Sequence, residues 1–130
     1  MFKNRFKKTT DKIDNEVAEY TYIDAGKFKD SFYVSIVNGD KVNIFKVKAK
    51  THIEAEYLAF LNAYLIYDTK TIYLSDNEFV VKHYNKVYNS KILLYNLLRD
   101  HIKEAKIEWI PREKNIADKY LRDYFKRLKR

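Results

Sequence analysis

Four acidic side chains stand where the chain could place oxygen ligands for a metal ion. They are Asp24 at the end of Tyr-Ile-Asp, Glu56 in Ala-Glu-Tyr, Asp76 at the end of Leu-Ser-Asp, and Asp118 in Asn-Ile-Ala-Asp. Carboxylate oxygens are the ligands that Mg²⁺ and Mn²⁺ prefer. Each acid alone is equally well explained as a helix cap, a dipole partner, a turn former or a solvated residue. Together they fall at strand ends and helix starts of one topology, which favours a shared metal site.

The elements that position these acids follow from hydrophobic periodicity and turn residues. Strands are predicted over 19–24, 31–37, 41–48, 71–75 and 106–110, and helices over 52–67, 78–88, 92–105 and from 115 onward. A turn is expected at Ala25-Gly26, and a hairpin at Asn38-Gly39 with positive φ at both central positions. Thr51 and Asn115 are the expected N-caps of the first and last helices.

This order predicts an α/β fold with a five-stranded mixed sheet, in which an antiparallel three-strand meander is joined by parallel strands and flanked by helices. The chain has 130 residues, of which 46% are hydrophobic, enough for one domain with a substantial core. We expect this domain to span 19–130. A basic N-terminal extension, 1–18, precedes it.

The charge balance points to an anionic partner. Lys and Arg number 26 against 18 acids, a formal charge of +8, and nucleic acid is the first candidate. The absence of cysteine excludes disulfides and thiolate metal sites. No apolar run approaches the length of a spanning helix, and no secretory leader is visible. We therefore expect a cytoplasmic monomer that does not enter a membrane.

The N-terminal extension has two interpretations. Basic residues at positions 3, 5, 7 and 8 interleave with Phe2 and Phe6, a pattern that can grip phosphates and stack bases. A solvated terminus has the same composition and is the favoured interpretation.

Three segments resemble type 1 ribonuclease H. They are Thr-His-Ile-Glu-Ala-Glu-Tyr-Leu-Ala at 51–59, Ile-Tyr-Leu-Ser-Asp-Asn-Glu-Phe-Val-Val at 72–81, and Trp-Ile-Pro-Arg-Glu-Lys-Asn-Ile-Ala-Asp at 109–118. The resemblance runs from about 20 to 124. It implies that Asp24, Glu56, Asp76 and Asp118 are catalytic and hold two Mg²⁺ or Mn²⁺ ions. It also implies that the RNA strand of an RNA·DNA hybrid is cut to leave 5′-phosphate and 3′-hydroxyl ends.

The same resemblance suggests which residues bind substrate, and where this chain departs from the family. The candidates are Gly26, Thr51, His52, Asn77, Glu78, Arg112 and Asn115. His52 and Ile53 replace two asparagines that contact the hybrid in relatives, and Asn77-Glu78 replaces a Ser-Gln pair. The Glu78 carboxylate is expected either to repel the substrate backbone or to help recruit a metal ion.

Several alternatives remain open at this point. Glu54 competes with Glu56, but it would point to a different face of the helix. Trp109 is expected in the core, because buried aromatic side chains dominate core area. The same fold also serves DNA nucleases and recombinases, and a weakly catalytic nucleic-acid-binding module is a further possibility.

Overall fold

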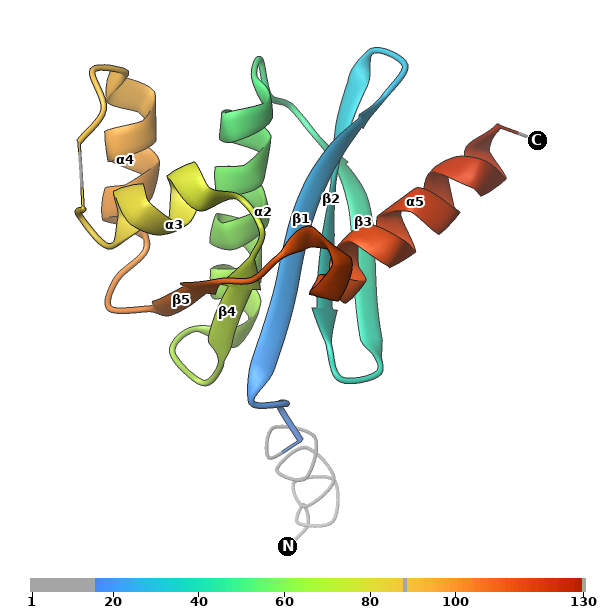
Figure 1. Cartoon of the computed structure of the whole chain (residues 1–130), viewed down its shortest axis with the longest axis horizontal. Helices are drawn as coiled ribbons and strands as arrows, with labels where there is room; N and C mark the ends of the chain where they lie inside the picture. Colours follow the sequence, from blue (N-terminus) through green and yellow to red (C-terminus); the bar gives the residue numbers. More distant parts are fainter. Residues whose placement is uncertain (1–15, 88, 130) are drawn as a thin grey trace, which may run out of the picture.

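A five-stranded sheet organises the chain, whose computed structural model describes residues 16–87 and 89–129. The strand order is β3-β2-β1-β4-β5 (Figure 1). β1 (Tyr20–Phe28), β2 (Ser31–Asn38) and β3 (Lys41–Val47) form an antiparallel meander. β4 (Ile72–Ser75) pairs in parallel with β1, and β5 (Lys106–Trp109) pairs in parallel with β4. The predicted fold class is confirmed.

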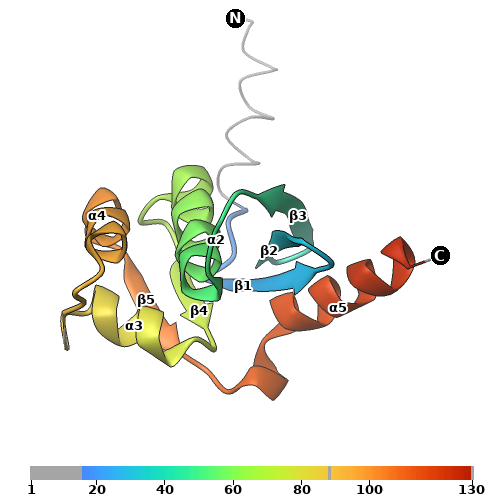
Figure 2. The same cartoon turned by 90° about the horizontal axis from the view of Figure 1, so that it is seen from above.

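Helices cover both faces of this sheet. They are α2 (His52–Tyr67), α3 (Glu78–Tyr84), α4 (Leu93–His101), the short 3₁₀ helix η1 (Arg112–Lys114) and α5 (Ile116–Leu128). Figure 2 shows α2 and α5 on opposite sides of β1. None of the helices in the described part of the chain combines the length and apolar character that crossing a bilayer requires.

The core lies between α2 and the sheet and is rich in aromatic side chains. Tyr57, Phe60 and Tyr73 are fully buried, and the rings of Phe60 and Tyr73 are 5.2 Å apart. Val17 packs against this cluster, so ordered packing begins just before β1. Residues 1–15 of the expected N-terminal extension lie outside the described part of the chain.

The turn predicted at Ala25-Gly26 is wrong. Both residues lie within β1, which pairs with β2 as far as Phe28 and turns after it, where Lys29 has a φ of 56°. A Cβ atom on Gly26 would meet Leu121 Cδ2 at 3.1 Å. The glycine therefore permits the close approach of α5 to the strand. In the sequence alone, a glycine needed for such packing cannot be distinguished from one that forms a turn.

The hairpin between β2 and β3 is displaced by one residue from its predicted position. Asn38 pairs with Lys41, so the turn is made by Gly39-Asp40. Of the two turn residues only Gly39 has a positive φ, 62°, as in a type II′ turn. The Asn38 side chain instead donates to Thr21 Oγ1 at 2.7 Å. This hydrogen bond links β2 to β1 through their side chains.

Two predicted helices end earlier than expected, each for a different reason. The Tyr84 hydroxyl donates to the carbonyl of Ile102 and accepts from the Ala105 amide, at 2.8 and 3.1 Å. α3 stops at Tyr84 and α4 at His101. These hydrogen bonds hold the chain that leaves α4. α3 ends instead in a backbone turn, in which Lys86 has a φ of 62° and the Val87 amide donates to the Lys82 carbonyl at 2.9 Å.

Candidate active site

The site forms where parallel pairing between β1 and β4 stops. The last paired residues are Ile23 and Ser75, so Asp24 and Asp76 follow directly on neighbouring strands. β4 ends there, but β1 continues, so the expectation that Asp24 ends its strand is wrong. Side chains that follow parallel strands at one sheet edge lie close together.

Glu56 reaches the same point from α2. Thr51 caps this helix as predicted, because its hydroxyl accepts from the Glu54 amide at 3.1 Å. Glu56 is 2% exposed, and one oxygen from each of Asp24, Glu56 and Asp76 lies within 4.8 Å of the others. Glu54 instead accepts a hydrogen bond from the Lys50 amide at 2.8 Å, outside this group.

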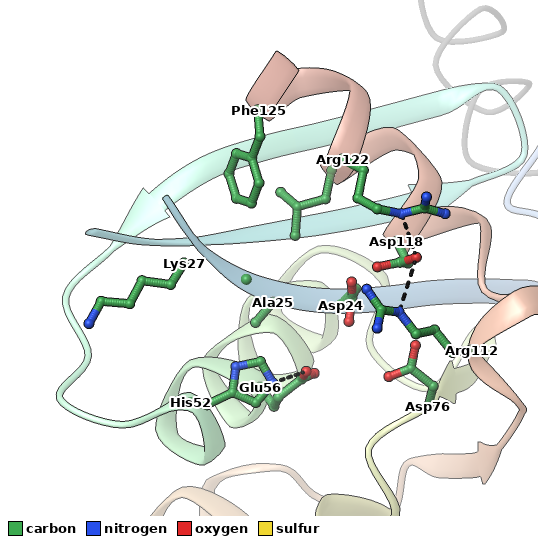
Figure 3. A pocket seen from close by; sticks show the side chains of 12 residues that line it. Asp24, Ala25, Lys27, His52, Glu56, Asp76, Arg112, Asp118, Arg122 and Phe125 are labelled. Carbon is green, nitrogen blue, oxygen red and sulfur yellow. Dashed lines mark hydrogen bonds and ion pairs between the residues drawn. The ribbon is translucent and has the colours of Figure 1, made fainter. Parts of the chain in front are cut away.

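Asp118, the fourth acid, lies near this group but is paired with two arginine side chains. It stands in the first turn of α5, and its Oδ2 is 2.9 Å from Arg122 Nε and 3.5 Å from Arg112 Nε. Figure 3 shows both guanidinium groups beside it. The compact ligand group found among the described residues therefore has three carboxylates, with the fourth at its border.

Asn115 connects three of the elements that build the site. Its side-chain amide donates to Ile23 O at 3.0 Å and to Asp76 Oδ2 at 3.1 Å. Its Oδ1 accepts from the Ala117 amide and caps α5 as predicted. Asn115 is 1% exposed, so its amide orients Asp76 from inside the protein.

Burial and mutual repulsion dominate the electrostatics of the acids. Burial, followed by repulsion from Glu56, Asp76 and Asp118, raises the pKa of Asp24 to about 9. Burial and the charge of Asp76 hold the pKa of Glu56 well above its ordinary value. Burial also raises the pKa of Asp76, while its hydrogen bond from Asn115 opposes the rise. The neighbouring groups of the protein therefore do not neutralise the negative charge that the ionised acids would carry.

These features fit a divalent cation. Glu56 Oε1 is one of two buried side-chain polar atoms in the described residues that lack a well-aligned hydrogen-bond partner; the other, Ser35 Oγ, lies on β2. A buried carboxylate oxygen without a partner is costly, and a hard cation supplies what it lacks. Asp24, Glu56 and Asp76 have the chemistry and the spacing to hold one.

The pocket above the acids has a volume of about 350 Å³ and a cationic rim. Three of the expected substrate-binding residues line it: Gly26, His52 and Arg112. Lys27, Arg122 and Phe125 also line it (Figure 3), and sequence reasoning did not identify them. The spacing of Arg122, four residues after Asp118 on a helix, was a usable signal. Lys27 was not identified because the predicted turn at Ala25-Gly26 ended the strand before it, whereas it lies within β1.

The other expected binding residues have contacts outside this pocket. Thr51 caps α2 and hydrogen-bonds the Tyr95 hydroxyl at 2.8 Å. Asn77 caps α3 by accepting from the Val80 amide at 2.9 Å. The Glu78 side chain is 63% exposed and pairs with Lys82 at 2.6 Å.

Trp109 is not in the core, contrary to expectation. It is 52% exposed, and its indole Nε1 donates to the Asp76 carbonyl at 3.2 Å. Among the described strands β5 lies at the edge of the sheet and pairs only with β4, so the residue at its end remains accessible.

The sequence matches no protein-family model, and no curated protein matches it. Solved structures do resemble the fold. Ribonuclease H1 from the halophilic archaeon Halobacterium salinarum is 19% identical, with a TM-score of 0.66 over 80% of this chain and 97% of that one. LC11-RNase H1, isolated from compost and in complex with an RNA/DNA hybrid, is 22% identical, with a TM-score of 0.65 over 77% and 91%. The N-terminal ribonuclease H domain of a Mycobacterium tuberculosis protein is 20% identical, with a TM-score of 0.58 over 85% and 95%. This chain has the type 1 ribonuclease H fold.

Proposed function

We propose that this protein is a metal-dependent endonuclease that hydrolyses the RNA strand of RNA·DNA hybrids. The observation that carries the proposal is the group of Asp24, Glu56 and Asp76 at one sheet edge of a ribonuclease H fold. A similar structure, LC11-RNase H1, is in complex with such a hybrid. Composition agrees, since a formal charge of +8 suits a polyanionic substrate.

The acids would hold two Mg²⁺ or Mn²⁺ ions, with Asp118 completing the set once Arg112 and Arg122 release it. Such ions activate a water molecule and stabilise the leaving oxygen of a phosphodiester. The contribution of the protein's own residues is to hold the acids in place. Asn115 holds Asp76 in one orientation, and the Asp24 backbone is fixed by pairing with β2.

The rim of the pocket would position the substrate. Arg112 and Arg122 place cationic groups beside the acids, where the phosphates on either side of the cleaved bond would pass, and Lys27 lines the pocket farther from the acids (Figure 3). Recognition of 2′-hydroxyl groups would select the RNA strand. The products would carry 5′-phosphate and 3′-hydroxyl ends.

One observation favours the alternative of a DNA nuclease. Position 52 is occupied by a histidine bound to Glu56, in place of an outward amide that would contact the minor groove of a hybrid. Fold alone does not separate the two activities.

A substrate panel tests the proposal. Labelled RNA·DNA hybrid, duplex DNA, duplex RNA and a four-way junction are incubated with the full chain in Mg²⁺, in Mn²⁺ and in EDTA. We expect metal-dependent cleavage of the RNA strand in the hybrid alone. Preferential cutting of duplex DNA or the junction supports the alternative, and no cleavage of any substrate contradicts both.

A further inference from the structure

His52 contacts one of the proposed metal ligands directly. Its Nε2 lies 3.0 Å from Glu56 Oε2, at the mouth of the pocket (Figure 3). We propose that His52 is a positioning residue that holds one oxygen of Glu56 and thereby presents the other to a divalent ion. This inference rests on the proposed function, because it concerns the same metal site.

The two oxygens of Glu56 have different surroundings, which gives the proposal its geometry. Oε2 is paired with His52, whereas Oε1 is buried and lacks a well-aligned partner. A glutamate side chain has three rotatable bonds, and the neighbouring Asp24 and Asp76 carboxylates would push an unrestrained one away. A hydrogen bond at Oε2 fixes the direction in which Oε1 points.

His52 is itself held in place. It is the first residue of α2, four residues before Glu56, so both side chains lie on the same helix face. Its ring packs against Phe32, with ring centroids 6.5 Å apart and planes at 51°. Its side chain is nevertheless 53% exposed, so the ring lies at the boundary between the site and solvent.

Helix stability does not explain this pair. Cations are unfavourable near a helix N-terminus, and an i,i+4 ion pair is stronger when the acid precedes the base. Here the base precedes the acid. Thr51 already caps the helix, and Glu54 supplies an acid to its first turn. We therefore infer that the contact orients the Glu56 carboxylate and contributes little to the stability of the helix.

The contact also distinguishes positioning from ligation. As a metal ligand Glu56 must be ionised, and an ionised carboxylate only accepts hydrogen bonds. Nε2 then carries the hydrogen in this pair, and a protonated nitrogen cannot bind a metal ion. The group of ligand atoms within 4.8 Å of one another comprises Asp24, Glu56 and Asp76, without His52. His52 thus acts through Glu56.

The test is a titration of the full chain with Mn²⁺ in the absence of substrate. The electron paramagnetic resonance signal of free Mn²⁺ measures how much of the ion is bound. Loss of a residue that orients a metal ligand weakens binding by about 10- to 100-fold, so we expect His52→Ala to raise the Mn²⁺ dissociation constant at least about tenfold. His52→Gln places an amide N–H near the position of Nε2 and should remain within about threefold of wild type. His101→Ala removes an exposed histidine on α4 and should change nothing.

Two further readouts keep the inference falsifiable. His52→Leu is a second variant without a donor, so a folding defect in the alanine variant does not decide the question. Pulsed electron paramagnetic resonance of bound Mn²⁺ should detect no directly coordinated nitrogen in the wild type. Wild-type affinity in both apolar variants, failure of His52→Gln to restore binding, direct nitrogen coordination, or absence of Mn²⁺ binding would each overturn the proposal.

The outcome can be separated from that of the proposed function. A wild type that binds Mn²⁺ with the expected dependence on His52, yet leaves the hybrid intact, contradicts the nuclease and leaves the positioning role standing. Hybrid cleavage with Mn²⁺ affinity that is independent of position 52 contradicts only the positioning role.

Discussion

The three clustered carboxylates oppose the stability of the metal-free protein. Burial, and after it repulsion from neighbouring carboxylates, raises the pKa values of Asp24, Glu56 and Asp76. Functional sites often retain such unfavourable arrangements, which the rest of the fold offsets. The cluster should therefore affect unfolding as well as activity.

The pH dependence of unfolding tests this effect at Asp24. The pKa of Asp24 rises from an ordinary value of 3.8 to about 9 in the folded protein. Between these values the native state binds more protons than the unfolded chain, so the free energy of unfolding falls as pH rises. We expect Asp24→Asn to flatten this fall and to be more stable than wild type at pH about 9 in EDTA. Urea denaturation at several pH values measures it.

An exposed acid provides the control for that experiment. Asp123→Asn removes a carboxylate on the exposed side of α5 and should keep the pH dependence of wild type. Equal pH profiles for Asp24→Asn and wild type would show that the cluster carries no stored repulsion.

Glu78 should have little influence on catalysis. Its side chain pairs with Lys82 and does not line the pocket, although it follows Asp76 closely in the sequence. We expect Glu78→Gln to leave both the Michaelis constant for the hybrid and the required Mg²⁺ concentration unchanged at low salt. Arg112→Gln, which removes a rim cation, should raise the Michaelis constant in the same assay. A shift in either quantity for Glu78→Gln would place its carboxylate at the site.

α5 carries Asp118 to the site, and its position depends on its first residues and on β1. Gly26 lets Leu121 and Phe125 approach the strand closely. Asn115 then ties the start of the helix to Ile23 and Asp76. The helix and two strands thus meet through one buried side chain.

Substitution of Asn115 should reveal how strongly this junction is held. Asn115→Ala removes an N-cap, worth about 1 kcal/mol, and leaves the buried Ile23 carbonyl without its donor, at about 1–3 kcal/mol. We expect a loss of about 2–4 kcal/mol in the free energy of unfolding. Asn115→Ser retains a capping hydroxyl and should lose about 1 kcal/mol less. Equal losses in both variants would mean that the cap contributes nothing.

Elements with local signals were predictable from sequence. Helix 52–67 was predicted with its observed bounds, because its periodicity and its cap at Thr51 are both local. The meander followed from alternating residues around Gly39. Gly26 was misread because its reason is contact with α5, far along the chain. The end of α4 depends on the Tyr84 hydroxyl, whose two backbone partners also lie far from it in sequence.

The site was predictable in composition but not in its detailed contacts. The segments around the four acids identified Asp24, Glu56 and Asp76, which meet at the sheet edge, and Asp118, which lines the same pocket. The arginines on Asp118, the amide on Asp76 and the imidazole on Glu56 depend on side-chain directions that one-dimensional spacing does not specify. Trp109 was assigned to the core from its residue type, although the edge position of β5 leaves it exposed.

At the scale of the whole molecule, the protein combines a pocket that contains clustered acids with a positive net charge. The formal charge is +8, while the acids gather at one sheet edge. Long-range attraction would bring a polyanion to the surface, and the cationic rim would admit its phosphates to the acids. The fold is shared with ribonuclease H structures at 19–22% identity.

The alternative interpretation of the basic N-terminal extension, in which its charges bind phosphates, makes a prediction that separates it from a solvated terminus. Deletion of residues 1–8 should weaken hybrid binding and reduce the slope of log affinity against log salt by about 0.9 for each phosphate that these residues neutralise. Cleavage at saturating hybrid should persist. Replacing only the basic residues at 3, 5, 7 and 8 with serine keeps Phe2 and Phe6, and so separates charge from stacking. An unchanged salt slope would support a solvated terminus.

The rate of hybrid cleavage by Asp76→Asn under single-turnover conditions in Mg²⁺ or Mn²⁺ tests whether the acidic cluster performs the chemistry. The substitution nearly conserves shape and removes one charge that would hold the ions, while Asn115 remains in place beside it. Metal ions supply several kcal/mol of transition-state stabilisation, and we expect the rate to fall about a thousandfold while the unfolding midpoint in EDTA is no lower than that of wild type. Turnover by Asp76→Asn at the wild-type rate in the same metal would contradict the assignment of this site.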